Sequence, residues 1–271
     1  MLGGVSAAVL AACAPALSAT GLPTTVPPQP TLAAPTLAAL AGATATGITP
    51  ATALSTAAAT GGPTQAAATG ASAPTCIVRP ALTEGPYFVD EKLNRSDVRS
   101  DPTDGSVKNG AQLNLAIRVS QINGSGCVPL AGATVDIWHC DALGVYSDAS
   151  DPSFNTKGKK FLRGYQVTDA NGTVQFITIY PGWYQGRAVH LHFKIRTNTG
   201  SATAHDFTSQ FFFDDTLTDQ VHARAPYASK GAGRLRNADD GIYQGGGDQL
   251  LLALTPAGQG YSTTFDIGLQ F

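Results

Sequence analysis

Four side chains capable of binding or activating a ligand lie close together in one short segment of the sequence. They are a phenol, a guanidinium and two imidazoles, contributed by Tyr184, Arg187, His190 and His192. Residues 188–195 alternate between polar and apolar types, which predicts a β-strand with both histidines on one face. Side chains two residues apart on a strand lie about 6–7 Å apart. This spacing suits two ligands of one metal ion, and we therefore expect a metal centre on this strand.

Short β-rich segments separated by turn residues recur from residue 76 to the end of the chain. Asn171 and Gly172 separate two such segments, as in a β-hairpin. Helical periodicity is confined to a short stretch at 216–224. About eight short strands with Gly- and Pro-rich connections predict an all-β fold, an antiparallel β-sandwich. The expected strands cover 113–119, 133–138, 161–168, 173–179, 187–196, 208–213, 250–253 and 261–269.

The start of the chain resembles an export signal. Residues 1–12 are small and apolar, and the Leu-Ala-Ala that precedes Cys13 is typical of a bacterial lipobox. A positively charged first region, which secretory signals contain, is missing. We expect residues 1–13 to be a signal with a lipid anchor at Cys13; simple secretion and a coincidental cysteine are the alternatives. The apolar run is shorter than the roughly 20 residues that a membrane-spanning helix needs.

A tether of unusual composition follows this signal. Residues 1–74 contain no Asp, Glu, Lys or Arg, and residues 14–75 consist mainly of Ala, Thr, Pro, Gly and Ser. Such a segment buries too little apolar surface to offset the entropy lost on ordering. We expect a disordered tether at 14–75 and a folded domain at 76–271, placed outside the cell or at its surface.

Charge and cysteine content restrict the partners and suggest one disulfide. The net charge of −2 and the pI near 6.2 give no indication of nucleic-acid binding. Of the four cysteines, Cys76 and Cys127 are the favoured disulfide pair in an exported domain, although sequence alone leaves the connectivity open. Cys140 is interpreted as a small buried residue.

Four motifs occur in order between about residues 83 and 215. They are Thr-Glu-Gly-Pro-Tyr-Phe at 83–88, the strand 130–138 followed by Gly-Val-Tyr at 144–146, Pro-Gly-Trp-Tyr at 181–184 and Arg-Ala-Val-His-Leu-His at 187–192. This combination resembles the intradiol ring-cleavage dioxygenases, the catechol and protocatechuate 3,4-type enzymes. An isolated His-x-His pair would be a weak signal, whereas the ordered set is specific.

The resemblance implies a non-haem Fe(III) centre with one ion per chain. Its ligands would be Tyr146, Tyr184, His190 and His192. Phenolates are hard anionic donors that favour Fe(III), and imidazoles complete the set without adding charge. The iron would act as a Lewis acid toward a bound catechol.

The resemblance also implies catalytic roles. Tyr184 would accept a substrate proton, Arg187 would stabilise developing negative charge, and Gln210 would be a polar group beside the metal ligands. With O2, a catechol-type ring would open between its two hydroxyl-bearing carbons to give a muconate-type diacid. Residues 83–87 are left open between part of the pocket wall and a simple turn, and His139 is interpreted as a supporting or structural residue.

Some features depart from the family and leave questions open. Only five residues separate Tyr184 from His190, and Ala188 stands where a proline is common, so the substrate wall differs and protocatechuate is not assumed. The charge-free tether replaces the helical dimerisation segment of intracellular relatives, and the oligomeric state is left open. His205 and His222 are assigned to loops.

Two other interpretations compete with the dioxygenase. The first is a non-catalytic β-sandwich that binds a metal or an aromatic ligand on the same scaffold. The second is a cupin-like Fe(II) or Cu site, which predicts a glutamate shortly after His-x-His. Because the sequence there is Lys194-Ile195-Arg196, the cupin interpretation is disfavoured.

Overall fold

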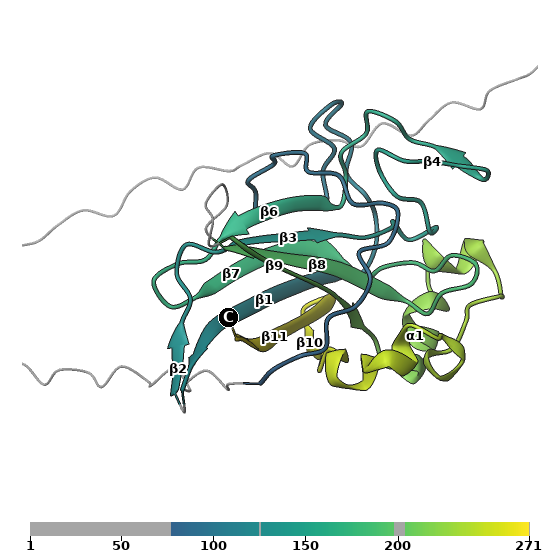
Figure 1. Ribbon diagram of the computed structural model, residues 1–271. Helices are drawn as coiled ribbons and strands as arrows, with labels where there is room; N and C mark the ends of the chain where they lie inside the picture. Colours follow the sequence, from purple (N-terminus) through teal and green to yellow (C-terminus); the bar gives the residue numbers. More distant parts are fainter. Residues whose placement is uncertain (1–76, 125, 198–203, 271) are drawn as a thin grey trace, which may run out of the picture. The chain divides into compact units, whose positions relative to one another are not determined.

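Two β-sheets form the framework of the protein (Figure 1). The computed structural model describes residues 77–124, 126–197 and 204–270, all within one compact unit. The first sheet has the order β10-β11-β1-β2, with β7 also paired to β1. Its strands are β1 (Gln112–Asn123), β2 (Gly126–Pro129), β7 (Thr173–Ile179), β10 (Thr255–Ala257) and β11 (Gly260–Leu269).

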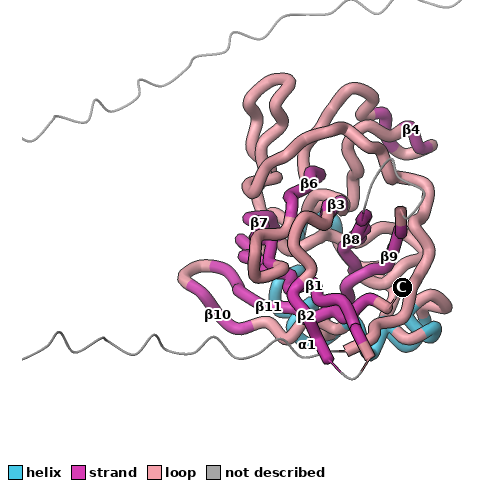
Figure 2. The backbone as a smooth tube through the Cα atoms, turned by 60° about the vertical axis from the view of Figure 1, so that its left-hand side comes forward, coloured by secondary structure: helices cyan, strands magenta, loops and turns pink. Residues whose placement is uncertain are grey.

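The second sheet carries the histidine motif. Its order is β6-β3-β8-β9, and all of its neighbouring strands are antiparallel. A separate short hairpin, β4 (Ser150–Asp151) with β5 (Phe154–Asn155), lies away from both sheets in two views (Figures 1 and 2). The strands of the second sheet are β3 (Thr134–Trp138), β6 (Arg163–Val167), β8 (His190–Thr197) and β9 (His205–Phe212).

Helical segments follow β9 and gather beside one end of the sheets in Figure 1. Helix α1 (Asp215–His222) is capped by Asp214, whose carboxylate accepts a hydrogen bond from the Leu217 amide at 2.8 Å. This element confirms the helix expected near 216–224. Four 3-10 helices follow: η1 (Tyr227–Lys230), η2 (Asn237–Asp239), η3 (Tyr243–Gly245) and η4 (Gly247–Leu250).

The core lies between the two sheets and confirms the predicted sandwich. Alternate residues of β1 and β8 are fully or almost fully buried in one apolar cluster. Phe193 on β8 stacks on Phe211 of β9 with ring centroids 4.1 Å apart. Because this packing fixes which face of β8 points inward, it also fixes where the two histidines point. One pairing is not antiparallel, since β1 and β11 run parallel.

Two local predictions were wrong. Residues 250–253 do not form a strand: Leu250 ends η4, and Leu251 makes only an isolated bridge to Phe212. Their alternation arises because Leu250 and Leu252 pack into the core from an extended segment. The Asn171-Gly172 turn also does not close a hairpin, since β6 and β7 belong to different sheets.

The Asp169 carboxylate explains why that turn nevertheless has hairpin-like residues. It accepts hydrogen bonds from the Asn171 and Thr173 amides at 2.9 and 2.8 Å. Gly172 has φ +72°, and a Cβ there would lie 2.2 Å from the Val119 carbonyl oxygen. The turn therefore needs a glycine although it carries the chain from one sheet to the other.

The structure tests some of the cysteine predictions. Cys140 is free and buried, as expected. Cys127 is disulfide-bonded, but Cys76 lies outside the described residues, so the Cys76–Cys127 pairing stays a prediction. The expected signal, Cys13 and the tether at 14–75 also lie outside them. Within the described ranges, no helix is long and apolar enough to cross a membrane.

Candidate active site and metal centre

Strand β8 carries two buried imidazoles at its start. His190 is the first residue of β8, and His192 pairs with Trp138 on β3 and with Gln210 on β9. The apolar residues that alternate with them face the core, so both histidines point to the opposite face. Loops cover that face, and the two residues are only 2% and 1% exposed. Their Nε2 atoms lie 3.1 Å apart.

Two tightly packed loops supply the tyrosines. Tyr146 lies in the loop that follows β3, and Tyr184 lies in the loop between β7 and β8. A Cβ on Gly144 would lie 2.2 Å from a carbonyl oxygen of the second loop, and one on Gly182 would lie 2.5 Å from two carbonyl oxygens of the first. The glycines of both tyrosine motifs therefore allow backbone-to-backbone contact that brings the two phenols together.

All four predicted metal ligands converge on one point. The Nε2 atom of His190 lies 3.4 Å from the Tyr146 hydroxyl oxygen, 3.2 Å from that of Tyr184 and 3.1 Å from Nε2 of His192. Ligand atoms held at about 2.0–2.1 Å from one ion lie roughly 3.0–3.4 Å from each other. The arrangement therefore fits a single metal ion with two oxygen and two nitrogen donors.

The hydrogen bonds of His190 define which of its nitrogens is available. Its Nδ1–H donates to the Ala188 carbonyl oxygen at 2.7 Å, so Nε2 presents a lone pair to the cluster. His192 stacks on Trp138 with ring centroids 4.9 Å apart and an interplanar angle of 7°. The buried Nδ1 of His192 has no hydrogen-bond partner among the described residues.

Burial sets the charge state of the cluster. It lowers the pKa of His190 to about 3 and places the pKa of His192 well below its ordinary value. Burial also raises the pKa of Tyr184 to about 12, against the opposing positive charge of Arg187, and raises that of Tyr146 well above its ordinary value. All four side chains are therefore neutral near pH 7, and binding a cation through the phenols releases protons.

Arg187 lies beside the cluster and is held at two of its nitrogens. Its Nε donates to Asp240 Oδ2 at 2.9 Å, and its Nη2 donates to Gln210 Oε1 at 2.6 Å. Gln210 is fully buried, and its side-chain amide donates to the Thr83 carbonyl oxygen at 2.8 Å. The structure thus brings both further predicted residues, Arg187 and Gln210, to the ligand cluster.

Two residues of the segment 83–87, Gly85 and Tyr87, lie against predicted metal ligands. Gly85 has φ +71°, and a Cβ on it would lie 3.3 Å from the His192 ring. Tyr87 stacks on Tyr146 with ring centroids 4.4 Å apart, and its hydroxyl donates to Asp151 Oδ2 at 2.8 Å. The hairpin β4–β5 is therefore linked to a predicted metal ligand through Tyr87.

A pocket of about 720 Å³ opens onto the two tyrosines. Aromatic rings form much of its lining, and one cation and one carboxylate also border it. The lining includes Tyr87, Tyr146, Asp151, Phe154, Trp183, Tyr184 and Lys230. A planar aromatic ligand would therefore contact aromatic side chains while its polar edge faces the ligand cluster.

Sequence reasoning missed two contributors to the site. Asp240 binds Arg187 from a position more than fifty residues further along the chain, where no motif surrounds it. The buried Arg163 donates to the Ser147 hydroxyl at 2.7 Å and to the Tyr87 carbonyl oxygen at 3.2 Å, which ties together two walls of the site. A glycine two residues before each ligand tyrosine is a signal of loop packing that was present in the motifs.

The other histidines lie outside the cluster. His139, left out of the predicted ligand set, donates from Nδ1 to the Cys140 carbonyl oxygen and accepts at Nε2 from the Thr178 hydroxyl at 2.6 Å. His205 and His222 are not in loops, since they begin β9 and end α1. No group of three or more His, Cys, Asp or Glu side chains suited to a metal occurs in the described ranges, because half of the donors here are phenols.

Comparison with known proteins identifies the family. Residues 83–228 match the family model described as Dioxygenase. An intradiol ring-cleavage dioxygenase from Tetranychus urticae is 31% identical, with a TM-score of 0.63 over 72% of this chain and 95% of that chain. The dioxygenase domain of a dioxygenase–carbohydrate-binding protein fusion from Streptomyces sp. SirexAA-E is 27% identical, with a TM-score of 0.50 over 72% and 99%. The chain belongs to the intradiol ring-cleavage dioxygenase family.

Curated relatives match over shorter segments. The protocatechuate 3,4-dioxygenase beta chain of Burkholderia cepacia is 33% identical over 119 residues, which are 41% of this chain and 50% of that protein. Catechol 1,2-dioxygenase 2 of Acinetobacter lwoffii is 33% identical over 112 residues, 39% of this chain and 35% of that protein. The chain therefore spans half or less of the length of these two relatives.

Proposed function

We propose that the protein is a non-haem Fe(III) intradiol dioxygenase that uses O2 to open a catechol-type ring between its two hydroxyl-bearing carbons. The observation that carries the proposal is that two phenol oxygens and the His192 Nε2 each lie 3.1–3.4 Å from the His190 Nε2, beside an aromatic pocket. Two phenolates favour Fe(III) over softer or less charged ions.

The four converging residues would hold the ferric ion. Once bound, it would supply Lewis-acid activation of the catechol and a fixed position for substrate. The residues around it prepare this role: the Ala188 carbonyl keeps the Nε2 lone pair of His190 directed at the ion, and the Trp138 ring restrains His192. Burial of the cluster keeps bulk water away from the reacting ring.

Tyr184, which would be deprotonated as a ligand, is the tyrosine suited to take a substrate proton at its phenolate oxygen. It is half-buried, lies on a loop that lines the pocket and is close to the positive charge of Arg187. Tyr146, in contrast, is 1% exposed and stacked under Tyr87. We therefore assign permanent ligation to Tyr146 and proton acceptance to Tyr184.

Arg187 would stabilise negative charge that develops on the substrate ring during cleavage. Asp240 and Gln210 hold its guanidinium in one orientation, so no reorganisation is required when the charge appears. Gln210 would act through Arg187, because its oxygen accepts from the guanidinium and its nitrogen is occupied by Thr83.

The pocket favours catechols that carry a substituent. Its volume of about 720 Å³ lies in the range of roughly 300–1,000 Å³ typical for ligands much larger than a single ring. Phe154, Trp183 and Lys230 would contact the substituent beyond the reacting ring. We further propose that the protein is exported and meets its substrate outside the cell, with Cys13 as the lipid attachment point.

Isotope labelling tests the reaction. The iron-loaded protein is supplied with catechol and ¹⁸O2, and the product is analysed by mass spectrometry. We expect a muconate-type diacid that contains both labelled oxygen atoms, and no product from His192→Ala. A protein that binds iron and catechol but leaves the ring intact would contradict the proposal and support the non-catalytic binding alternative.

A further inference from the structure

The Asp240 carboxylate accepts four hydrogen bonds beside the predicted active site, although the residue is only 2% exposed. Its Oδ2 accepts from Arg187 Nε at 2.9 Å and from the Ala188 amide at 2.8 Å. Its Oδ1 accepts from the Ile242 and Tyr243 amides at 2.8 and 3.4 Å. Each carboxylate oxygen is thus engaged, and the Arg187 bond is charge-assisted.

Ala188 connects this carboxylate to a predicted metal ligand. Its amide donates to Asp240, and its carbonyl oxygen accepts from His190 Nδ1–H at 2.7 Å. The latter bond selects the tautomer that leaves Nε2 free to bind a metal. Asp240 therefore fixes the Arg187 guanidinium directly and the His190 imidazole through one residue of backbone.

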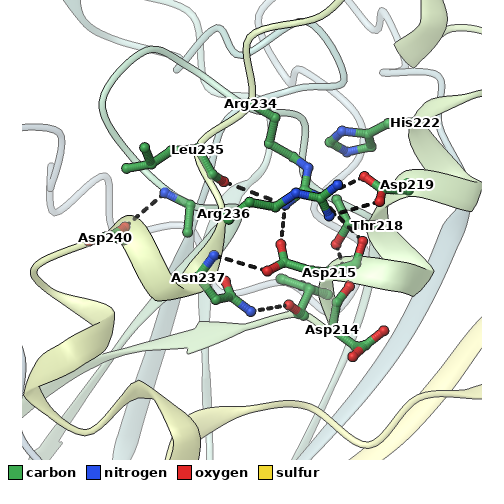
Figure 3. Close-up of polar contacts among 12 residues, drawn as sticks. Asp214, Asp215, Thr218, Asp219, His222, Arg234, Leu235, Arg236, Asn237 and Asp240 are labelled. Atoms are coloured by element: carbon green, nitrogen blue, oxygen red, sulfur yellow. Dashed lines mark hydrogen bonds and ion pairs between the residues drawn. The ribbon is translucent and has the colours of Figure 1, made fainter.

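A clamp on α1 keeps Asp240 in place (Figure 3). Arg234 forms ion pairs with Asp215 and Asp219, the second at 2.7 Å. Asn237 donates from its backbone amide to Asp215 Oδ2 at 3.1 Å and from its side chain to the Phe213 carbonyl oxygen at 2.8 Å. The Asp240 amide in turn donates to the Asn237 carbonyl oxygen at 3.1 Å. These hydrogen bonds connect Asp240 through Asn237 to helix α1.

We propose that Asp240 is a positioning residue that aligns Arg187 with the substrate ring and His190 with the metal. The proposal rests on the function proposed above, and it assigns a role to a residue beyond the segment 83–228 that matches the family model. A carboxylate suits this task because both of its oxygens accept hydrogen bonds, Oδ2 from Arg187 and Ala188 and Oδ1 from the Ile242 amide. An asparagine amide nitrogen can accept none of these bonds.

The first test uses metal-free protein and does not depend on catalysis. Histidine ¹⁵N–¹H spectra report which ring nitrogen carries the proton. Wild type is expected to show His190 as the Nδ1–H form, and Asp240→Asn is expected to show a mixture of the two tautomers. Asp266→Asn is the matched control, since it removes an aspartate–arginine pair, with Arg118, that joins β1 to β11 instead. It should leave the His190 signals unchanged.

The second test measures turnover of catechol by iron-loaded variants. We expect kcat of Asp240→Asn to fall about 10- to 100-fold, the usual loss when a group supporting a metal ligand is removed, with KM changed less than about threefold because the pocket walls are untouched. In an Arg187→Gln background, Asp240→Asn should lower kcat much less and still disturb the His190 tautomer.

The outcomes separate the two proposals. A shifted tautomer without catechol cleavage by any variant would retain the positioning role and refute the function. Folded Asp240→Asn with an unchanged His190 signal and kcat within twofold of wild type would overturn the positioning role, as would an equal loss in Asp266→Asn. If Asp240→Asn does not fold, the same two measurements on Asp240→Ser decide, because serine is smaller and replaces the carboxylate with a single neutral hydroxyl.

Discussion

Four neutral side chains meet at the start of β8, and burial reinforces their neutral forms. It raises the pKa values of Tyr146 and Tyr184 and lowers those of His190 and His192. A ferric ion would reverse the effect for the tyrosines, because the phenolate is the form that binds metal. Neutral imidazoles are already in their metal-binding form. Binding of the ion would therefore release two protons, one from each tyrosine.

Replacing one phenol tests the ligand assignment. In Tyr146→Phe we expect iron content to fall and the visible charge-transfer band per iron to lose roughly half of its intensity, since one of two phenolates remains. Tyr180→Phe is the control, because Tyr180 is also buried but its hydroxyl bonds to Thr218 at 2.7 Å, away from the cluster. Iron analysis and absorption spectra measure both variants. Equal spectra for Tyr146→Phe and wild type would contradict the assignment.

At the scale of elements, two loops and two sheets have to meet accurately for the site to form. The loops that carry the tyrosines touch through Gly144 and Gly182, where any side chain would strike a carbonyl oxygen. The sheets are linked by His139, which follows β3 in one sheet and bonds to Thr178 on β7 in the other. Each link can be tested separately.

The loop contact predicts that alanine variants of two glycines in one loop differ in iron content. Gly182→Ala places a Cβ 2.5 Å from two carbonyl oxygens, so we expect the loops to separate, iron to be lost and stability to fall by about 1–3 kcal/mol. Gly186→Ala meets no atom within 4 Å and has φ +84°, so it should cost about 1–2 kcal/mol and keep its iron. Iron analysis and urea unfolding distinguish them. Iron loss in both variants would refute the contact argument.

The sheet-bridging His139 predicts a loss of stability in acid. Burial lowers its pKa to about 4, against about 6.5 in the unfolded chain. As pH falls from 6.5 to 4, the unfolded chain gains a proton that the folded protein does not, so the stability falls, by about 3 kcal/mol for this residue. His139→Gln removes that contribution. We expect the pH dependence of unfolding to be shallower in His139→Gln, and identical slopes would show that His139 does not titrate as described.

Parts of this arrangement were predictable from local sequence and parts were not. The alternation around His190 and His192 reflects burial on one face of β8, so it identified both the strand and the direction of the two side chains. The prediction of a strand at 250–253 was wrong. Leu250 and Leu252 alternate because they pack into the core, and the segment makes only an isolated bridge to β9. Asp240 could not be found, since only tertiary contacts bring its otherwise ordinary loop to Arg187.

For the whole molecule, all residues assigned to the site lie within the described part of one sandwich unit, Ala66–Phe271. The ligand cluster and the pocket lining that the structure describes are built from residues between Tyr87 and Lys230. We therefore predict that the chemistry proposed for the sandwich does not depend on the predicted signal and tether.

Truncation tests this separation. A variant that starts at residue 66 keeps Cys76 and the whole sandwich unit. We expect its iron content and its kcat with catechol to stay within about twofold of the full chain, because the site contacts are unchanged. Iron analysis, turnover and thermal unfolding provide the comparison. Loss of iron in the truncated but folded variant would mean that the N-terminal segment takes part in the site.

The central claim is that two tyrosines and two histidines bind one ferric ion, and resonance Raman spectroscopy in the visible band measures it most directly. The account predicts a red-brown protein with one iron per chain, enhanced tyrosinate vibrations, and loss of the iron in His192→Ala. A colourless protein with no tyrosinate vibrations, or full retention of iron and colour in His192→Ala, would contradict it.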